Sequence, residues 1–157
     1  MIDESKRIVI NRDNDLISLF SPAPKADLEK VLGPLSQEAY EDHIKERLGM
    51  TEAPLVIDAA DVPSDRLYRD AWVLRDGKIV EEFSKAAEIQ KDKWRERRAP
   101  LLQALDVEFT KASEQMDVNK QHQIGLKRQE LRDVTIIPKS IKTIEQLRAY
   151  VPNAFKE

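Results

Sequence analysis

The sequence predicts an α+β protein, with a small β-rich N-terminal unit, then an antiparallel helical hairpin and a short C-terminal helix. Short β-branched runs separated by turn residues occupy residues 1–82. From residue 83 onward, apolar residues recur every three or four positions, which is typical of helices. A short polar break, "QMDVN", divides that stretch, so its two halves are expected to pack against each other. We therefore expect a small α+β domain over 1–82, a hairpin over 83–134 and a C-terminal extension over 135–157.

Local residue types predict the elements of the first unit, which should hold one or two short helices. Residues 7–20 indicate two strands around the polar turn "NRDND". Ser36 is a suitable N-cap for a helix that Gly49 would close in a left-handed conformation. "PLVIDA" (54–59) predicts a further strand. Asp76-Gly77 between apolar runs predicts a β-hairpin, because both residues tolerate positive φ.

The helical part is predicted from its apolar spacing. One face of the first helix would carry Trp94, Leu101, Leu105, Phe109, Ala112 and Met116. Ile124, Leu131 and Val134 would face inward from the second helix. Thr143 is the expected cap of the last short helix, which should end before Pro152.

Two residues in this part are poor helix formers. Pro100 follows three arginines and predicts a kink or a helix restart, with the arginines ending one helix and proline opening the next. Gly125 costs about 1 kcal/mol relative to alanine inside a helix. We expect it to permit close approach of the partner helix near Phe109.

The composition narrows the classes of function. The chain has 157 residues, no cysteine and a formal net charge of −3. Residues 1–83 carry 11 basic and 18 acidic side chains, and the remainder carries 15 and 11. The basic excess of the second half is too small to indicate a nucleic-acid partner. With no apolar run of membrane-spanning length and no apolar N-terminal signal core, we expect no membrane partner and a cytoplasmic location.

No constellation of catalytic or metal-binding residues is evident, so we expect no enzyme, cofactor or metal. The two histidines, His43 and His122, lack ligand spacing and are expected at the surface. "RDND" (12–15) could hold a hard cation but more simply forms a turn. Arg95, Arg97 and Arg98 could contact a nucleic acid beside Trp94, yet interleaved acids favour a solvated helix face.

Several motifs resemble a known family. These are "DRLYRDAW", "KAAEIQKDKWRERRAPLLQALDVEF", "KRQELRDVT" and "TIEQLRAYVP". Together they are similar to the C-terminal module of bacteriophage tail-fibre assembly proteins, also called tail chaperones. The chain departs from that pattern at Val107 and Lys127, where those proteins usually have aromatic residues.

The resemblance implies a set of residues for partner binding or for fixing the hairpin. Its motif positions correspond to Arg95, Arg98, Leu101, Leu102, Asp106, Arg128, Gln129, Leu131, Arg132 and Asp133. Asp106 and Asp133 could form polar clasps with Arg98 and Arg132, or all four could be independent solvated charges. Trp94, Trp72 and Tyr68 could anchor a partner or belong to the core.

The implied function is that of a non-enzymatic phage tail protein binding a tail or tail-fibre polypeptide. It would act as an assembly chaperone in the host cytoplasm, or remain in the virion as a minor tail-tip or fibre-attachment component. A homo-oligomer is compatible with either role. The alternative from another class is a small host-directed regulatory or anti-defence binding protein.

Overall fold

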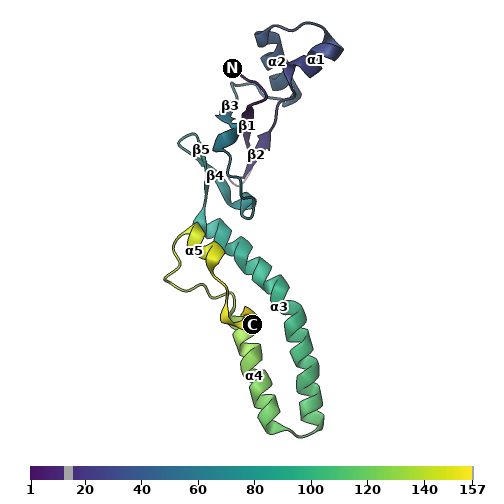
Figure 1. Cartoon of the computed structure of the whole chain (residues 1–157), viewed down its shortest axis with the longest axis vertical. Coiled ribbons are helices and arrows are strands. Elements are labelled where there is room, and N and C mark those ends of the chain that lie inside the picture. The colour runs from purple at the N-terminus through teal and green to yellow at the C-terminus, as the bar shows by residue number, and fades with distance from the viewer. Residues whose placement is uncertain (13–15, 157) are drawn as a thin grey trace. The chain divides into compact units, whose positions relative to one another are not determined.

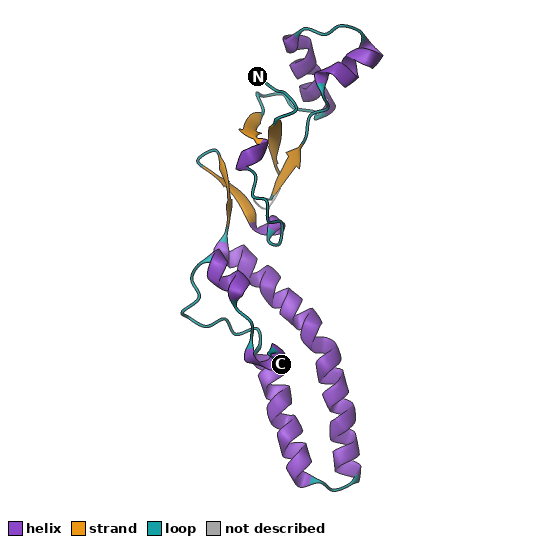
Figure 2. Ribbon diagram, viewed as in Figure 1, coloured by secondary structure: helices purple, strands orange, loops and turns teal. Residues whose placement is uncertain are grey.

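The computed structural model describes residues 1–12 and 16–156 and divides into two compact units, Met1–Glu82 and Phe83–Glu157. Among the described residues, every strand lies in the first unit, and the second unit is built from helices (Figure 2). The predicted α+β class is confirmed, including the helical hairpin and the short C-terminal helix. The turn expected at residues 13–15, with the carboxylates considered there as cation ligands, lies outside the described residues.

The described residues of the first unit form two antiparallel sheets and two short α-helices. The three-stranded sheet has the order β2-β1-β3, and β4 and β5 form a separate hairpin. The strands are β1 (Lys6–Asn11), β2 (Ile17–Phe20), β3 (Leu55–Asp58), β4 (Trp72–Arg75) and β5 (Lys78–Glu81). The helices are α1 (Lys25–Leu32) and α2 (Gln37–Arg47), and the 3₁₀ turns η2 (Ala59–Asp61) and η3 (Arg69–Ala71) lie between β3 and β4.

The central strand β1 supports a core on each of its faces. Ile8 is fully buried on one face, in a cluster with Tyr40 and Ile44 of α2. Its neighbour Val9 points to the other face, where it packs with Trp72 and other β4–β5 residues. Successive strand residues alternate between faces, so the run "IVI" serves two cores at once.

The helix ends predicted at Ser36 and Gly49 and the turn predicted at Asp76-Gly77 are confirmed. The Ser36 hydroxyl accepts a hydrogen bond from the Ala39 amide at 3.1 Å, as an N-cap does. Gly49 follows α2 with a φ of +63°. Asp76 and Gly77 both have positive φ, +50° and +74°, and join β4 to β5.

In the second unit, two long antiparallel helices form the predicted hairpin (Figure 1). These are α3 (Phe83–Glu114) and α4 (Val118–Asp133), followed by α5 (Ile144–Ala149) and a 3₁₀ turn, η4 (Asn153–Phe155). The C-terminal segment packs on α3: the Trp94 and Tyr150 rings meet edge to face at 5.7 Å. Thr143 caps α5 as predicted, in a reciprocal pair with Gln146.

The helix restart predicted at Pro100 is wrong. α3 is one continuous helix with Pro100 inside it, and the arginines that precede the proline do not end a helix. Figure 1 shows that α3 bends along its length, in agreement with the alternative of a kink. A proline removes one backbone donor and crowds the preceding turn, which is a common cause of helix bending.

Two other expectations for the hairpin are also wrong. Gly125 is exposed, and a Cβ atom added there would meet nothing within 4 Å, so it does not permit a close helix approach. Met116 is not on the inward face: it follows α3 with a φ of +55° and is 85% exposed. Leu101 is also exposed, whereas Trp94 and Ala112 are buried as predicted.

The surroundings of Gly125 predict that Gly125→Ala stabilises the chain. Alanine meets no steric obstacle there and costs less backbone entropy in a helix, so we expect a gain of about 0.5–1 kcal/mol. Gly77→Ala is the matched control, because its φ of +74° should make alanine destabilising. Denaturant unfolding of both variants measures the difference. A destabilised Gly125→Ala chain would contradict this assignment of a solvent-facing glycine.

Candidate functional site on the helical hairpin

Arg128 of α4 contacts two side chains of α3. Its Nη2 lies 2.8 Å from the Asp106 carboxylate, and its guanidinium sits over the Phe109 ring at 5.3 Å. An ion pair and a cation–π contact therefore meet at one arginine between the two helices. The clasp considered from the sequence, with Arg98 or Arg132 as the partner of Asp106, is wrong, because the carboxylate pairs with Arg128.

Arg98 instead closes the end of α4. Its Nη1 donates to the backbone carbonyls of Arg132 at 2.8 Å and Leu131 at 3.4 Å. The last carbonyls of a helix have no partner within the helix, so a guanidinium supplied by the neighbouring helix is a favourable cap. Arg98 thus joins the two helices through the backbone of α4 rather than through an aspartate.

Among the described residues, Asp133 forms no clasp between the helices. Its carboxylate accepts a hydrogen bond at 2.9 Å from Gln129, one turn earlier in α4. Arg95 likewise pairs with Asp92 within α3, as the interleaved charges suggested. Of the two clasps considered, only Asp106 bridges the helices, and it does so through a different arginine.

The hairpin also carries a groove that could not be predicted from the sequence. It has a volume of about 390 Å³ and lies between α3, α4 and η4. Its apolar lining comes from Leu101, Ala104, Leu105, Leu131 and Ala154, and its polar lining from Glu108, Lys127, Glu130, Asn153 and Lys156. Residues of η4 also line the groove, and the apolar periodicity of α3 and α4 does not indicate where η4 packs.

The large aromatic residues considered as partner anchors belong to the core. Trp94 is 4% exposed, and Trp72 and Tyr68 are almost completely buried. Leu102 is half-buried on α3, whereas Leu101, which lines the groove, is 42% exposed. Among the motif residues of the hairpin, Leu101 is therefore the apolar side chain most accessible to a partner.

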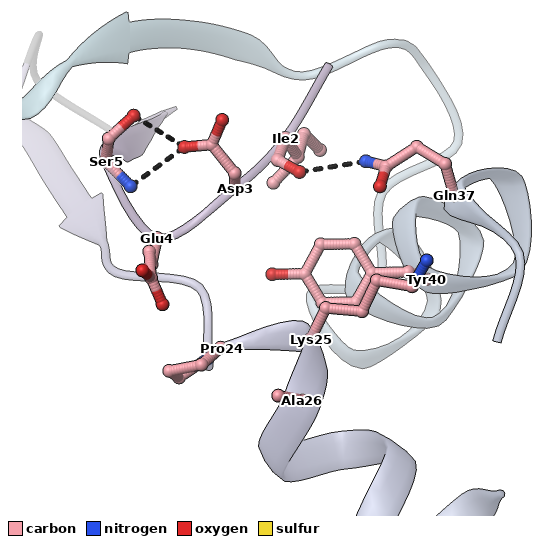
Figure 3. Close-up of a pocket in the computed structure, with 9 residues that line it drawn as sticks. All are labelled: Ile2, Asp3, Glu4, Ser5, Pro24, Lys25, Ala26, Gln37 and Tyr40. Carbon is pink, nitrogen blue, oxygen red and sulfur yellow. Dashed lines mark hydrogen bonds between the residues drawn. The ribbon is translucent and has the colours of Figure 1, made fainter. Parts of the chain in front are cut away.

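The first unit has a cavity beside its N-terminus, of about 500 Å³ (Figure 3). Ile2 and Gln37 lie on one side of it, and the Tyr40 hydroxyl, directed away from α2, donates to the Ala23 carbonyl at 2.7 Å. Next to this cavity, the Glu41 carboxylate accepts from the Gln37 side chain and from the Ile2 amide. These hydrogen bonds lower the pKa of Glu41 below its ordinary value.

Within residues 1–12 and 16–156, no three His, Cys, Asp or Glu side chains gather closely enough to hold a metal ion. None of the helices in the same residues is long and apolar enough to cross a membrane. The chain matches no known protein family, no curated protein and no solved structure. The resemblance to tail-fibre assembly proteins therefore stays a prediction from the motifs quoted above.

Two aspartates of the hairpin should differ in their effect on stability. Asp106→Ala removes an ion pair between helices, and we expect it to cost about 0.5–1 kcal/mol, a modest value because the carboxylate is largely exposed. Asp133→Ala removes only a contact within α4 and should cost less. Urea unfolding compares the two. Equal losses would contradict an interhelical role specific to Asp106.

The lowered pKa of Glu41 predicts an acid-sensitive contribution to stability. The ionised carboxylate stabilises the fold fully above its unfolded value of about 4.5, and this contribution is lost as pH falls through the lower folded pKa. Glu41→Gln should therefore flatten the acid dependence of unfolding below about pH 4.5, whereas Glu46→Gln, exposed on the same helix, should not. Trp72 fluorescence during denaturation, in a chain with Trp94→Phe, reports on the first unit. An unchanged pH profile for Glu41→Gln would contradict this role.

Proposed function

We propose that this chain is a non-enzymatic bacteriophage tail protein that binds a tail or tail-fibre polypeptide. It acts either as an assembly chaperone that leaves before the particle matures, or as a minor tail-tip or fibre-attachment component that stays in the virion. In both roles it meets its partner in the host cytoplasm during assembly. The observation that carries the proposal is the groove at Leu101, because this exposed motif residue opens onto further apolar side chains.

The arrangement of the motif residues supports a binding role for the hairpin. Leu101 lies in the groove and Asp106 pairs with Arg128, so one stretch of α3 supplies both an accessible apolar residue and an interhelical contact. Fixing the two helices in register keeps the groove walls of α3 and α4 in place. A preformed groove lowers the entropy lost when a partner binds.

The rim of the groove indicates what kind of interaction it favours. Two acidic residues, Glu108 and Glu130, and two basic residues, Lys127 and Lys156, line it. Because these charges balance, long-range attraction to a charged partner is weak, and affinity has to come from burial of the apolar floor. Binding of a tail polypeptide here should therefore depend weakly on salt.

Mass spectrometry of gradient-purified phage particles, beside the crude lysate they came from, tests the proposal. Peptides at fixed stoichiometry in the particles identify a virion component. Abundant peptides in the lysate, absent from particles, with fibre protein captured in a pulldown, identify a chaperone. Absence from particles together with capture of a host protein, and of no tail protein, would overturn the proposal in favour of the host-directed alternative.

A substitution in the groove should weaken capture of the tail or tail-fibre polypeptide. Leu101→Glu places a charge on the apolar floor, and we expect at least about a tenfold loss of affinity. Val107→Glu is the matched control, since Val107 is an exposed apolar residue of the same helix outside the groove lining. Circular dichroism checks that both variants stay helical. Equal capture by the two variants would place the binding surface elsewhere.

A further inference from the structure

A second cavity, in the first unit, gathers three arginines. It has a volume of about 420 Å³, within the range of small-molecule sites, and Arg7, Arg66 and Arg69 all line it. Ser21 and Ser64 add hydroxyl groups. Among the described residues of its lining there is no aspartate or glutamate. The cavity is thus a concentration of positive charge within a unit whose acidic residues outnumber its basic ones, 18 to 11.

The arginines reach the cavity from two parts of the first unit. Arg7 belongs to β1, and its Nη1 donates to the carbonyls of Lys6 at 2.7 Å and Glu4 at 3.0 Å, which fixes the direction of its guanidinium. Arg66 and Arg69 flank the fully buried Tyr68, which anchors their segment in the unit. An amide of that segment, Arg69 N–H, also donates to the Arg66 carbonyl at 3.2 Å.

The donors of the cavity are in part unused. Within residues 1–12 and 16–156, neither Arg66 nor Arg69 makes a side-chain ion pair or hydrogen bond. Trp72, which is 1% exposed, also lines the cavity, and its indole N–H has no acceptor in the described part of the chain. The indole N–H is itself buried, so the donors open to a ligand in the cavity are those of the arginines and the two serine hydroxyls.

We infer that this cavity binds a dianionic phosphoryl group, as free phosphate or as a small phosphomonoester. Guanidinium groups match the oxygens of phosphate with paired N–H donors, and three of them converge here with two hydroxyls. Apolar residues such as Leu19, Val62 and Pro63 complete the wall and provide a surface for the organic part of an ester. A carboxylate has fewer oxygens and less charge, so it uses fewer of these donors. The inference concerns the first unit and does not rest on the function proposed for the hairpin.

Isothermal titration calorimetry of the full chain tests the inference, at ionic strength held constant with chloride. Inorganic phosphate, glycerol 3-phosphate and acetate are the three probes. Saturable binding of either phosphate compound, at least about tenfold tighter than acetate, is the expected result. The tighter of the two phosphates then identifies free ion or ester as the better ligand. No saturable binding of phosphate, or equal binding of acetate, would overturn the inference.

Exposed arginine variants locate the site. Arg66→Ala and Arg69→Ala should each weaken phosphate binding about tenfold, since each removes charge-assisted hydrogen bonds. Arg47→Ala, an exposed arginine of the same unit that does not line the cavity, should leave the affinity unchanged. Trp72 emission in a chain with Trp94→Phe should change over the same phosphate concentrations. Unaltered affinity in both cavity variants, or unaltered Trp72 emission, would place the bound phosphate elsewhere and refute the site.

Discussion

The main constraint on both units of this chain is the limited number of apolar side chains available to form a hydrophobic core. Charged residues make up 35% of the sequence, so each apolar residue that is buried matters to its core. In the first unit, β1 contributes to two cores, because Ile8 packs against the helices and Val9 packs against the β4–β5 hairpin. A shift of the β1 register by one residue would exchange these two faces and bring Arg7 into a core, so both cores fix the same register.

The second unit meets the same constraint with polar contacts between its helices. Trp94 and Ala112 of α3, and Ile124 and Leu131 of α4, are the buried apolar residues of the hairpin helices beyond the α3 N-terminus. Arg128 joins the helices between these positions, although its buried Nε has no hydrogen-bond partner among the described residues. Because an unpaired buried donor is costly, Arg128 contributes to the alignment of the helices more clearly than to net stability.

The fold could be predicted where neighbouring residues decide it. Ser36, Thr143 and Asp76-Gly77 act on their own backbone, so their roles follow from residue type alone. The contacts of the hairpin could not be predicted, because they depend on how far one helix is shifted along the other. The sequence places Asp106 within reach of several arginines, and only the observed register selects Arg128. The surroundings of Gly125 could not be predicted for the same reason, since its position around α4 relative to α3 is set by packing.

Pro100 shows a different limit. The lost hydrogen bond of a proline favours ending a helix, but residues on both sides of Pro100 contact α4: Arg98 caps the end of α4, and Asp106 pairs with Arg128. Tertiary contacts on each side thus offset one lost hydrogen bond and hold the helix together through the proline.

The two candidate binding regions differ in what sequence could reveal about them. Leu101 belongs to a motif that can be read along the chain, whereas Arg7 is far in sequence from Arg66 and Arg69. Over the first unit as a whole, acidic side chains outnumber basic ones, 18 to 11. The fold gives the opposite balance locally, because it brings β1 and the segment 66–69 to one cavity without bringing a carboxylate to its described lining. Local charge, and not the sum over a unit, decides what a cavity of this size attracts.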